Sequence, residues 1–451
     1  MNIIILAAGK GTRMKSDLPK NLHKVIGRTM LDMVCDLALS IGNNVIAVIS
    51  EEMDGLINKK EEIKYVIQKD RLGTGHAVQI AESAIDKKFD KTVILYGDTP
   101  LISKDIIDKK IFKLNECDLV VSAFEVGDIN QKYGRLITEY DVVRQIVEYK
   151  NASSEIKNIR LCNSGIFAVK TSILCKLLNQ IQKDKLSGEY YLTDLVELCH
   201  NNNFYCKYIE CPEDSLLGIN SQEDLWVAIN KYQHKLRLMH LESGVRMLDP
   251  SAVYFYDDTK IGSGTEIAQG VIFGENVKIG TNCKIGVYSY LSNSNIANNT
   301  IINGFSHIDG CRTEDNVNIG PFARIRSQTE LKFGAKIGNF VEVKASVFGE
   351  HSKANHLAYI GDTEIGDNTN FGAGSITCNY DGFKKHKTKI GNDCLVGANS
   401  SLVAPVVIGN GSVIGAGSVI TKDTNDDDLS VGRSEQKNIP MGGKKYKSKK
   451  Q

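Results

Sequence analysis

The sequence lacks several features that would assign it to a common class of protein. Its 11 cysteines are scattered singly and never form a C-x-x-C pair. This spacing argues against a zinc knuckle or a disulfide framework and predicts reduced thiols in the cytosol. No apolar run approaches the roughly 18 residues that a membrane span requires. The short apolar run over residues 1–8 lacks a basic n-region and leads straight into Gly9-Lys10-Gly11, so it predicts a first strand rather than a signal peptide.

An excess of one charge is also missing. Lys and Arg number 55 and Asp and Glu number 54, so no global field favours nucleic acid or an anionic membrane. Any anion must therefore be bound by a local group of side chains. With 451 residues, of which 42% are apolar, the chain is long enough for two or three domains with real cores.

The stretch "LAAGKGTRM" follows an Ile-Ile-Ile run near the start of the chain. It matches neither common phosphate loop, because the third glycine of G-x-G-x-x-G is missing and the G-x-x-x-x-G-K-[ST] order is absent. Its glycines still allow backbone N–H groups to approach phosphates, while Arg13 and Lys20 supply positive charge. The stretch therefore predicts a loop that binds phosphates.

Up to about residue 220, β-branched runs such as "NIIILA" and "KTVILYGD" alternate with segments of helical period. This alternation predicts a Rossmann-like α/β domain with a mainly parallel sheet covered on both faces. Ligands of such sheets bind at the carboxyl ends of strands, where Gly9 and Asp98 fall. Ser221 and Asp224 form a capping-box pattern that opens a single linking helix, and Gly244 ends it.

From residue 261, apolar residues recur every six positions in three blocks. They are Ile261, Ile267, Phe273, Ile279, Ile285 and Leu291; Ile319, Ile325, Leu331, Ile337 and Val343; and Ile390, Val396, Leu402, Ile408, Ile414 and Ile420. This hexapeptide period predicts an all-β parallel β-helix with three hexads in each coil, a triangular prism. The period breaks at residues 346–360 and 377–389, which predicts two loops on a binding face.

Two groups of side chains in the predicted prism suggest chemistry. Arg326 and Lys344 are one full coil apart, so their side chains should stack on one face and could clamp a sugar phosphate. His356 lies in the first predicted loop, beside Tyr359. Acyl transfer to an amine needs a base with a pKa near 7, and imidazole is the natural choice.

Motifs along the whole chain resemble those of one family. The motifs "LAAGKGTRM…LPK", "YGDTPL", "NHLAYIGDTEIG" and "TCNYDG" follow in that order on a sheet domain and a hexapeptide prism. With these motifs in this order, the chain resembles the bacterial family of bifunctional N-acetylglucosamine-1-phosphate uridylyltransferases and glucosamine-1-phosphate acetyltransferases. The resemblance implies a uridylyltransferase domain over residues 1–221, a linker helix over 222–244, and a left-handed parallel β-helix acetyltransferase domain with a C-terminal tail over 245–451.

For uridylyl transfer, the resemblance implies that Arg13 and Lys20 are catalytic cations and that Asp98 and Asn220 hold Mg²⁺. Uracil would meet Gln68, Gly73 and Thr74, and the sugar would meet Gly134, Glu148 and Asn163. The full implied set for nucleotide and sugar is Leu6, Ala7, Ala8, Gly9, Lys20, Gln68, Gly73, Thr74, Tyr96, Gly97, Asp98, Gly134, Glu148, Asn163 and Asn220.

For acetyl transfer, the resemblance implies His356 as the base. Glucosamine-1-phosphate would meet Arg326, Lys344, Tyr359 and Asn370, and acetyl-CoA would meet Ala373, Asn379, Tyr380, Ala398, Ala416 and Arg433. The family commonly has Ser where this chain has Ala398, so only a backbone contact is expected there. The basic run over 444–450 predicts a disordered, solvated tail without a catalytic role, and contact with the phosphates of CoA is the alternative.

The expected function is a cytosolic enzyme that makes UDP-N-acetylglucosamine, a precursor of peptidoglycan and lipopolysaccharide. Acetyl-CoA first acetylates glucosamine-1-phosphate in the prism, and UTP with Mg²⁺ then uridylylates the product and releases pyrophosphate. The resemblance also implies a homotrimer that shares acetylation sites between prisms. Nucleic acid and membrane insertion are not expected.

Two other interpretations stay open. A sugar nucleotidyltransferase with a regulatory prism, resembling ADP-glucose pyrophosphorylase, would have no use for His356, Arg433 or the "TCNYDG" loop. A non-catalytic scaffold, resembling subunits of translation exchange factors, predicts decay of the charged loop, whereas Arg13 and Lys20 are both present.

Overall fold

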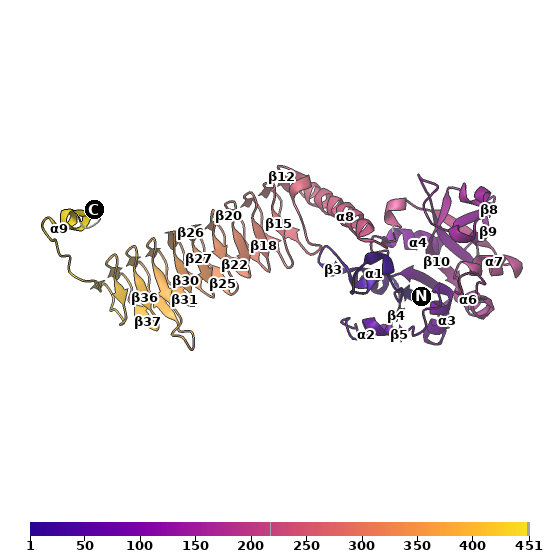
Figure 1. Cartoon of the computed structure of the whole chain (residues 1–451), viewed down its shortest axis with the longest axis horizontal. Coiled ribbons are helices and arrows are strands. Elements are labelled where there is room, and N and C mark those ends of the chain that lie inside the picture. Colours follow the sequence, from indigo (N-terminus) through magenta and orange to yellow (C-terminus); the bar gives the residue numbers. More distant parts are fainter. Residues whose placement is uncertain (217, 449–451) are drawn as a thin grey trace. The chain divides into compact units, whose positions relative to one another are not determined.

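The computed structural model describes residues 1–216 and 218–448 (Figure 1). The chain divides into two compact units, residues 1–233 and 234–451. Each unit is described by itself. All 11 cysteines lie in the described part and none forms a disulfide, as their spacing predicts. Among the described residues, no helix is both long and apolar enough to cross a membrane.

The first unit is built on a twisted mixed sheet. Its strands, in spatial order, are β5 (Ile63–Ile67), β4 (Asn44–Ile49), β1 (Asn2–Leu6), β6 (Lys91–Tyr96), β10 (Leu161–Lys170), β7 (Leu119–Glu125), β11 (Cys206–Glu210), β9 (Val142–Val147) and β8 (Arg135–Glu139). The half from β5 to β6 is parallel, and β10 runs antiparallel between β6 and β7. A two-stranded ribbon joins β2 (Lys24–Val25) to β3 (Arg28–Thr29).

Helices cover both faces of this sheet. They are α1 (Met30–Ile41), α2 (Glu51–Asp54), α3 (Thr74–Ala81), α4 (Lys104–Lys113), α5 (Ser154–Lys157), α6 (Thr171–Leu177) and α7 (Asp194–Asn201). Along β1, Ile3 joins the core that contains Leu31 of α1, while Ile4 joins the core that contains Val78 of α3. Because side chains alternate along a strand and both faces are covered, the run is apolar throughout.

The central pair of strands fixes where ligands can bind. Leu6 at the end of β1 lies in register with Tyr96 at the end of β6. The loop after β1 and the residues after β6 therefore leave the sheet side by side, at its carboxyl edge. Strand β10 carries a bulge between Asn163 and Phe167, which interrupts its ladder with β7.

The predicted linking helix is α8 (Gln222–Glu242). Its capping box forms, because the Asp224 amide donates to Ser221 Oγ over 3.1 Å and the Ser221 amide donates to the Asp224 carboxylate over 2.9 Å. Gly244 follows the helix with a φ of 88°, a conformation that costs glycine little.

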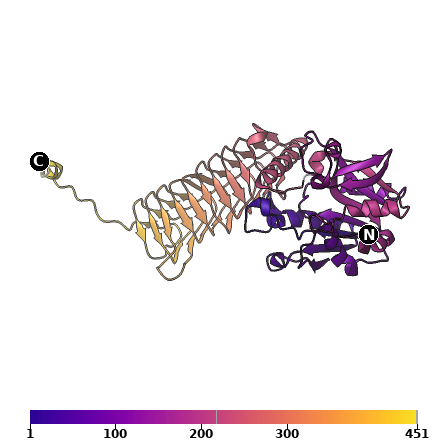
Figure 2. The ribbon, with the colours of Figure 1, turned by 45° about the vertical axis from the view of Figure 1, so that its right-hand side comes forward.

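In the second unit, within residues 234–448, the strands form three parallel sheets that make the faces of a prism (Figures 1 and 2). The first contains β12 (Arg246–Met247), β14 (Glu266–Ile267), β17 (Lys284–Ile285), β20 (Ile301–Ile302), β23 (Asn318–Ile319), β26 (Lys336–Asn339), β29 (Lys353–His356), β32 (Asn370–Phe371), β35 (Leu395–Val396), β38 (Val413–Ile414) and β40 (Leu429–Ser430). The second contains β13 (Lys260–Ile261), β16 (Lys278–Ile279), β19 (Asn295–Ile296), β22 (Cys311–Thr313), β25 (Thr329–Leu331), β28 (Val347–Phe348), β31 (Thr363–Ile365), β34 (Thr388–Ile390) and β37 (Val406–Ile408). The third contains β15 (Ile272–Phe273), β18 (Tyr290–Ser292), β21 (His307–Asp309), β24 (Arg324–Ile325), β27 (Glu342–Lys344), β30 (Tyr359–Gly361), β33 (Ile376–Cys378), β36 (Ser401–Val403) and β39 (Val419–Ile420).

The prediction of a loop at residues 346–360 is wrong. Ile319 pairs with Ile337, 18 residues later, and Ile337 pairs with Ala354, 17 residues later. The period breaks there because two successive coils are each one residue shorter, while β28, β29 and β30 continue the three sheets. The second predicted loop does leave the prism: Ile365 pairs with Ile390, 25 residues later, and the extra residues form a hairpin closed by a Tyr380–Lys385 bridge.

One corner of the prism carries an exposed ladder of apolar side chains. The aromatic ladder consists of Tyr288, Phe305, Phe322 and Phe340, whose rings stack at 5.0 to 5.5 Å between centroids. All four have positive φ angles and exposed fractions of 46 to 58%. Bulky residues rarely adopt this backbone conformation, so the ladder combines backbone cost with exposed apolar surface.

The tail is not disordered throughout, contrary to the prediction from the sequence, because part of it is helical. Residues 442–448 form a short helix, α9 (Gly442–Ser448). Lysine is a good helix former, which favours this conformation. Lys449 and Lys450 lie outside the described residues.

Candidate functional sites

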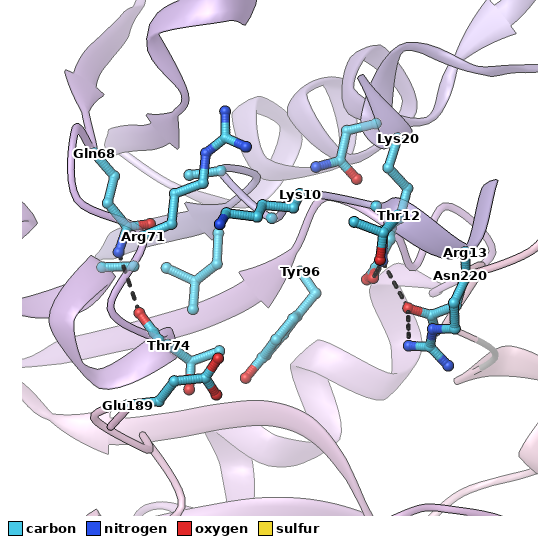
Figure 3. A pocket seen from close by; sticks show the side chains of 18 of the residues that line it. Lys10, Thr12, Arg13, Lys20, Gln68, Arg71, Thr74, Tyr96, Glu189 and Asn220 are labelled. Atoms are coloured by element: carbon cyan, nitrogen blue, oxygen red, sulfur yellow. Dashed lines mark hydrogen bonds and ion pairs between the residues drawn. The ribbon is translucent and has the colours of Figure 1, made fainter. Parts of the chain in front are cut away.

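A cleft of about 500 Å³ lies at the carboxyl ends of β1 and β6 in the first unit (Figure 3). It brings together the loop after β1, the start of α3 and the residue before the α8 cap. The sequence-predicted residues that line it are Leu6, Ala8, Gly9, Arg13, Lys20, Gln68, Gly73, Thr74, Tyr96, Asp98 and Asn220.

Cations and oxygen ligands meet at one end of this cleft. Lys20 Nζ forms an ion pair with Asp98 Oδ2 and donates to Asn220 Oδ1 over 2.9 Å. Arg13 also donates to Asn220 Oδ1, over 2.9 Å (Figure 3). The Lys20 and Asp98 side chains are only 10% and 16% exposed, so their interaction is poorly screened by solvent. The residues predicted to bind phosphate and metal are therefore together.

The glycines of the opening loop have two different roles. Gly11 has a φ of 62°, and a Cβ atom there would lie 2.5 Å from Lys20 Cβ, so its lack of a side chain lets Lys20 approach. A Cβ atom on Gly9 would meet no protein atom within 4 Å. The packing of the protein therefore does not require a glycine at this position. The absence of a side chain on Gly9 leaves open space in the cleft.

The other end of the cleft is rigid and polar. Gln68, only 4% exposed, donates from Nε2 to the Gly73 carbonyl over 3.2 Å. Gly73 has a φ of 105°, and a Cβ atom there would lie 2.5 Å from the Tyr190 carbonyl oxygen. Thr74 begins α3, and its Oγ1 accepts from the Leu192 amide over 3.0 Å. Such fixed amide and carbonyl groups can read a neutral base by hydrogen bonding.

Two predicted residues lie behind the cleft. The Ala7 amide donates to the Val48 carbonyl and the Gly97 amide donates to the Leu6 carbonyl, so both continue the sheet. The cleft also contains residues that were not in the predicted set. Lys10, Gly11, Thr12, Asn21, Arg71, Ala77, Glu189 and Tyr191 line it as well. Lys10 stands inside the opening motif, whereas nothing in the sequence around Arg71 or Glu189 marks them.

The three residues predicted for the sugar meet beside the cleft. The Asn163 amide donates to the Gly134 carbonyl over 2.8 Å, and a Cβ atom on Gly134 would lie 3.8 Å from Glu148 Oε1. Burial raises the pKa of Glu148, and Thr193 donates to its carboxylate over 3.0 Å. Burial, with the carboxylates of Glu148 and Asp98 nearby, also raises the pKa of Tyr96, which keeps its hydroxyl protonated.

The donor set suits a lightly bound metal ion. Among the described residues, no group of three His, Cys, Asp or Glu side chains is placed to hold a metal. Asp98 and Asn220 instead offer one carboxylate and one amide oxygen around a cation, the Lys20 ammonium. Such a pair of hard oxygens fits Mg²⁺, which binds to few protein ligands and completes its shell with water and phosphates.

In the second unit, His356 ends strand β29 and pairs in register with Asn339. Its imidazole is exposed, and Nδ1 lies 2.6 Å from Asn339 Oδ1. If Nδ1 carries the proton toward that oxygen, Nε2 is left free to accept one. A cleft of about 320 Å³ runs along these two residues. His356 therefore faces away from the packed interior of the prism.

Three of the residues predicted for acetyl-CoA, Ala373, Ala398 and Ala416, form a column along successive coils. The Asn399 amide donates to the Ala373 carbonyl over 2.8 Å, and the Gly417 amide donates to the Ala398 carbonyl over 2.8 Å. Arg433 then donates to the carbonyl of Ala416. Small residues thus line an extended path that ends at a guanidinium group. Asn379 and Tyr380 lie where the hairpin after β33 leaves the prism.

The residues predicted for glucosamine-1-phosphate are divided between two faces. Arg326 and Lys344 lie on successive coils of the third sheet, as their spacing predicts, and Arg326 forms an ion pair with Glu342 at 2.9 Å. Tyr359 follows in β30, one coil further along that sheet. Asn370 lies in β32 on the first sheet, where it pairs with Lys353.

The cleft beside His356 contains none of the predicted sugar-phosphate residues. One further cation was missed. The ammonium of Lys344 lowers the pKa of Lys385, which places the hairpin cation Lys385 against the predicted clamp. Its position depends on the fold of the hairpin, which the sequence pattern did not define.

Both units are similar to known protein families. Residues 3–159 match the family of MobA-like NTP transferase domains, and residues 258–293 and 387–422 match the bacterial transferase hexapeptide family with six repeats. A protein of Ruegeria sp. (strain TM1040), named bifunctional protein GlmU, is 42% identical over 448 residues, which cover 98% of this chain and 96% of that protein. The protein of the same name from Bartonella bacilliformis is also 42% identical, with 96% and 94% covered, and that of Zymomonas mobilis is 39% identical, with 99% and 97% covered. With this similarity extending over both units, the chain belongs to the GlmU family.

Proposed function

We infer that this chain is a bifunctional enzyme that makes UDP-N-acetylglucosamine. Its second unit transfers the acetyl group of acetyl-CoA to the amine of glucosamine-1-phosphate. Its first unit transfers the uridylyl group of UTP to the resulting N-acetylglucosamine-1-phosphate. Membership of the GlmU family supports both activities, and each unit has its own polar site to perform one of them.

For uridylyl transfer, a phosphate oxygen of the sugar phosphate attacks the α-phosphorus of UTP and the bond to pyrophosphate breaks. Arg13 and Lys20 neutralise the triphosphate, and Gln68, Gly73 and Thr74 hold the base. Gly134, Glu148 and Asn163 orient the sugar. The observation that carries this proposal is the convergence of Lys20, Asp98 and Asn220 in one cleft, since reaction between polyanions depends on positioning and charge neutralisation.

We also propose that Asp98 and Asn220 bind Mg²⁺ together with the substrate phosphates. When bound, the ion supplies positive charge to the leaving pyrophosphate. The Lys20 ammonium contacts both oxygens, which supports a position that favours cations.

For acetyl transfer, the sugar amine attacks the thioester carbonyl and its proton passes to His356. The C–S bond then breaks, and the leaving CoA thiolate takes that proton back from the protonated imidazole to leave as the thiol. Asn339 holds the ring so that one nitrogen can accept this proton. Acetyl-CoA binds along the Ala373, Ala398 and Ala416 column, with Arg433 at its end. A prism that only regulates the first unit would need neither the oriented imidazole nor this column.

The prism acts as a trimer in this proposal. The predicted clamp, Arg326, Lys344 and Tyr359, lies on a different face from His356 and Asn370. A neighbouring copy of the chain can complete each site by bringing its clamp to the imidazole of another copy. The exposed aromatic ladder lies on the prism surface and offers an apolar contact for such packing.

The decisive experiment assays both half-reactions with the full chain. Pyrophosphate release from UTP should require N-acetylglucosamine-1-phosphate, should stop with a chelator and should return with added Mg²⁺. Thiol release from acetyl-CoA should require glucosamine-1-phosphate and should be unaffected by the chelator. If thiol release is missing while pyrophosphate release is normal, the chain is a single-activity nucleotidyltransferase.

A further inference from the structure

Arg135, at the start of β8, is fully buried with an exposed fraction of 0%. A buried guanidinium is costly unless each N–H group finds a partner. Its partners are the carbonyl oxygens of Ile129 at 2.6 Å, Gln131 at 3.0 Å, Tyr133 at 2.8 Å and Lys157 at 3.4 Å, and the sulfur of Cys162 at 2.9 Å. Burial raises the pKa of Cys162 to about 11, so this sulfur is a neutral thiol at pH 7. None of the five acceptors is therefore a negative charge.

Three of these acceptors belong to one irregular segment. Residues 126–134 connect β7 to β8 without regular secondary structure. Because the guanidinium is planar and its donors form a rigid fork, it holds three carbonyls of this segment in fixed relative positions. Its charge is used to organise backbone rather than to form an ion pair.

The groups around Arg135 are the immediate neighbours of the residues proposed to hold the sugar. Gly134 directly precedes Arg135 in the chain. Glu148 directly precedes Tyr149, whose ring lies 5.2 Å from the guanidinium carbon. Asn163 directly follows Cys162, which accepts from the guanidinium and pairs with Arg135 across the ladder. The segments that carry the three sugar residues therefore meet at a single side chain.

We propose that Arg135 is a positioning residue for the sugar-phosphate subsite of uridylyl transfer. It sets the spacing of Gly134, Glu148 and Asn163 from behind and does not itself touch the sugar. Lysine cannot replace it, because one ammonium cannot hold carbonyls and a thiol in the geometry of a planar fork. The inference rests on the proposed uridylyl transfer and on the sugar contacts proposed for these three residues.

The test substitutes Arg135→Lys in the full chain and measures pyrophosphate release while each substrate is varied in turn. A displacement of the sugar contacts should raise KM for N-acetylglucosamine-1-phosphate by about 10- to 100-fold. KM for UTP should change by less than about twofold, and thiol release should be unchanged. Arg144→Lys is the matched control, because Arg144 lies on the adjacent strand β9 with its guanidinium paired to Glu139 on the surface. An unchanged sugar KM, or an equal rise for both substrates, overturns the proposal.

If Arg135→Lys does not fold, Tyr149→Leu decides. This substitution leaves the five hydrogen-bonding groups of Arg135 in place and removes the ring that packs against its guanidinium and against the Lys157 ammonium, so the sugar KM alone should rise by about threefold. No change in that KM overturns the proposal. Glu148→Gln distinguishes a failure of the proposed sugar site from a failure of the positioning role of Arg135. If it leaves the sugar KM unchanged, the proposed sugar site is wrong; if it raises that KM while the Arg135 and Tyr149 variants do not, only the positioning role is wrong.

Discussion

The amide oxygen of Asn220 lies 2.9 Å from Lys20 Nζ, although 200 residues separate them in the chain. Lys20 follows the opening loop, and Asn220 precedes the capping box of α8. The hydrogen bonds that start this helix also fix Asn220, because the backbone N–H of Asn220 donates to the Asp224 carboxylate over 2.9 Å. The cap of the helix thus holds one side of the candidate nucleotide site.

Replacing Asp98 with Asn should disable only the first reaction. The change removes the single carboxylate at the cation position and leaves Lys20 with an uncharged partner. Pyrophosphate release should fall about 10²–10³-fold, while thiol release stays normal. Asp36→Asn, an exposed carboxylate of the same unit, serves as the control. Loss of both activities from a folded protein would contradict two independent sites.

Replacing His356 with Ala should have the opposite effect. Without the imidazole, no group held by Asn339 can accept the amine proton, and thiol release should fall about 10²–10⁴-fold. Pyrophosphate release should be retained. His351→Ala is the comparison, because this nearby imidazole is exposed and packs edge-on against Phe333. Equal losses in the two variants would show that His356 is not the base.

Two glycines of the nucleotide cleft should respond differently to alanine. In Gly73→Ala, the positive φ and the 2.5 Å approach to the Tyr190 carbonyl should lower the free energy of unfolding by at least ~1 kcal/mol. In Gly9→Ala, the methyl group meets no protein atom, so stability should stay within ~0.5 kcal/mol. The Gly9 variant should instead raise KM for UTP about tenfold. Urea unfolding measures the free energy of unfolding, and substrate titration measures KM for UTP. A destabilised Gly9 variant would contradict the interpretation that the space beside Gly9 is left for a ligand.

The stability of the first unit should depend on pH through Asp194. Burial, with Glu197 and Glu148 nearby, raises the pKa of its carboxyl from 3.8 to about 6. The folded state thus binds the proton more tightly than the unfolded state, and stability falls as pH rises from about 4 through 6. Asp194→Asn should therefore be more stable than the native chain by ~1–2 kcal/mol at pH 7.5, after allowance for partial exposure, and equal to it near pH 4. Denaturant unfolding at both values measures this, and a constant difference would exclude Asp194.

The trimer depends on the aromatic ladder in our proposal. Phe322→Glu places a charge in the middle of the ladder, so the full chain should sediment as a smaller species and lose thiol release. Pyrophosphate release should be unaffected, because its cleft lies within the first unit. Phe333→Glu alters an exposed aromatic residue outside the ladder and is the control. A Phe322 variant that sediments like the native chain would place the interface elsewhere.

The sequence by itself determined the two architectures and predicted a phosphate-binding loop whose residues line the cleft of the first unit. Apolar runs such as Asn2–Leu6 and the six-residue period are local patterns, and local patterns decide strands and coils. The motif glycines and cations stay close to one strand end, so their convergence follows from the parallel order. The same pattern failed at residues 346–360, because a coil shorter by one residue breaks the period as an insertion does.

Only the tertiary structure decided what depends on contacts between distant segments. It placed the predicted sugar-phosphate clamp and His356 on different faces, it brought Lys385 against Lys344, and it buried Arg135 among loop carbonyls. None of these leaves a signal in the local sequence. They depend on the register of coils and on which backbone groups lack a partner after folding, and these are set by the packing of the whole unit.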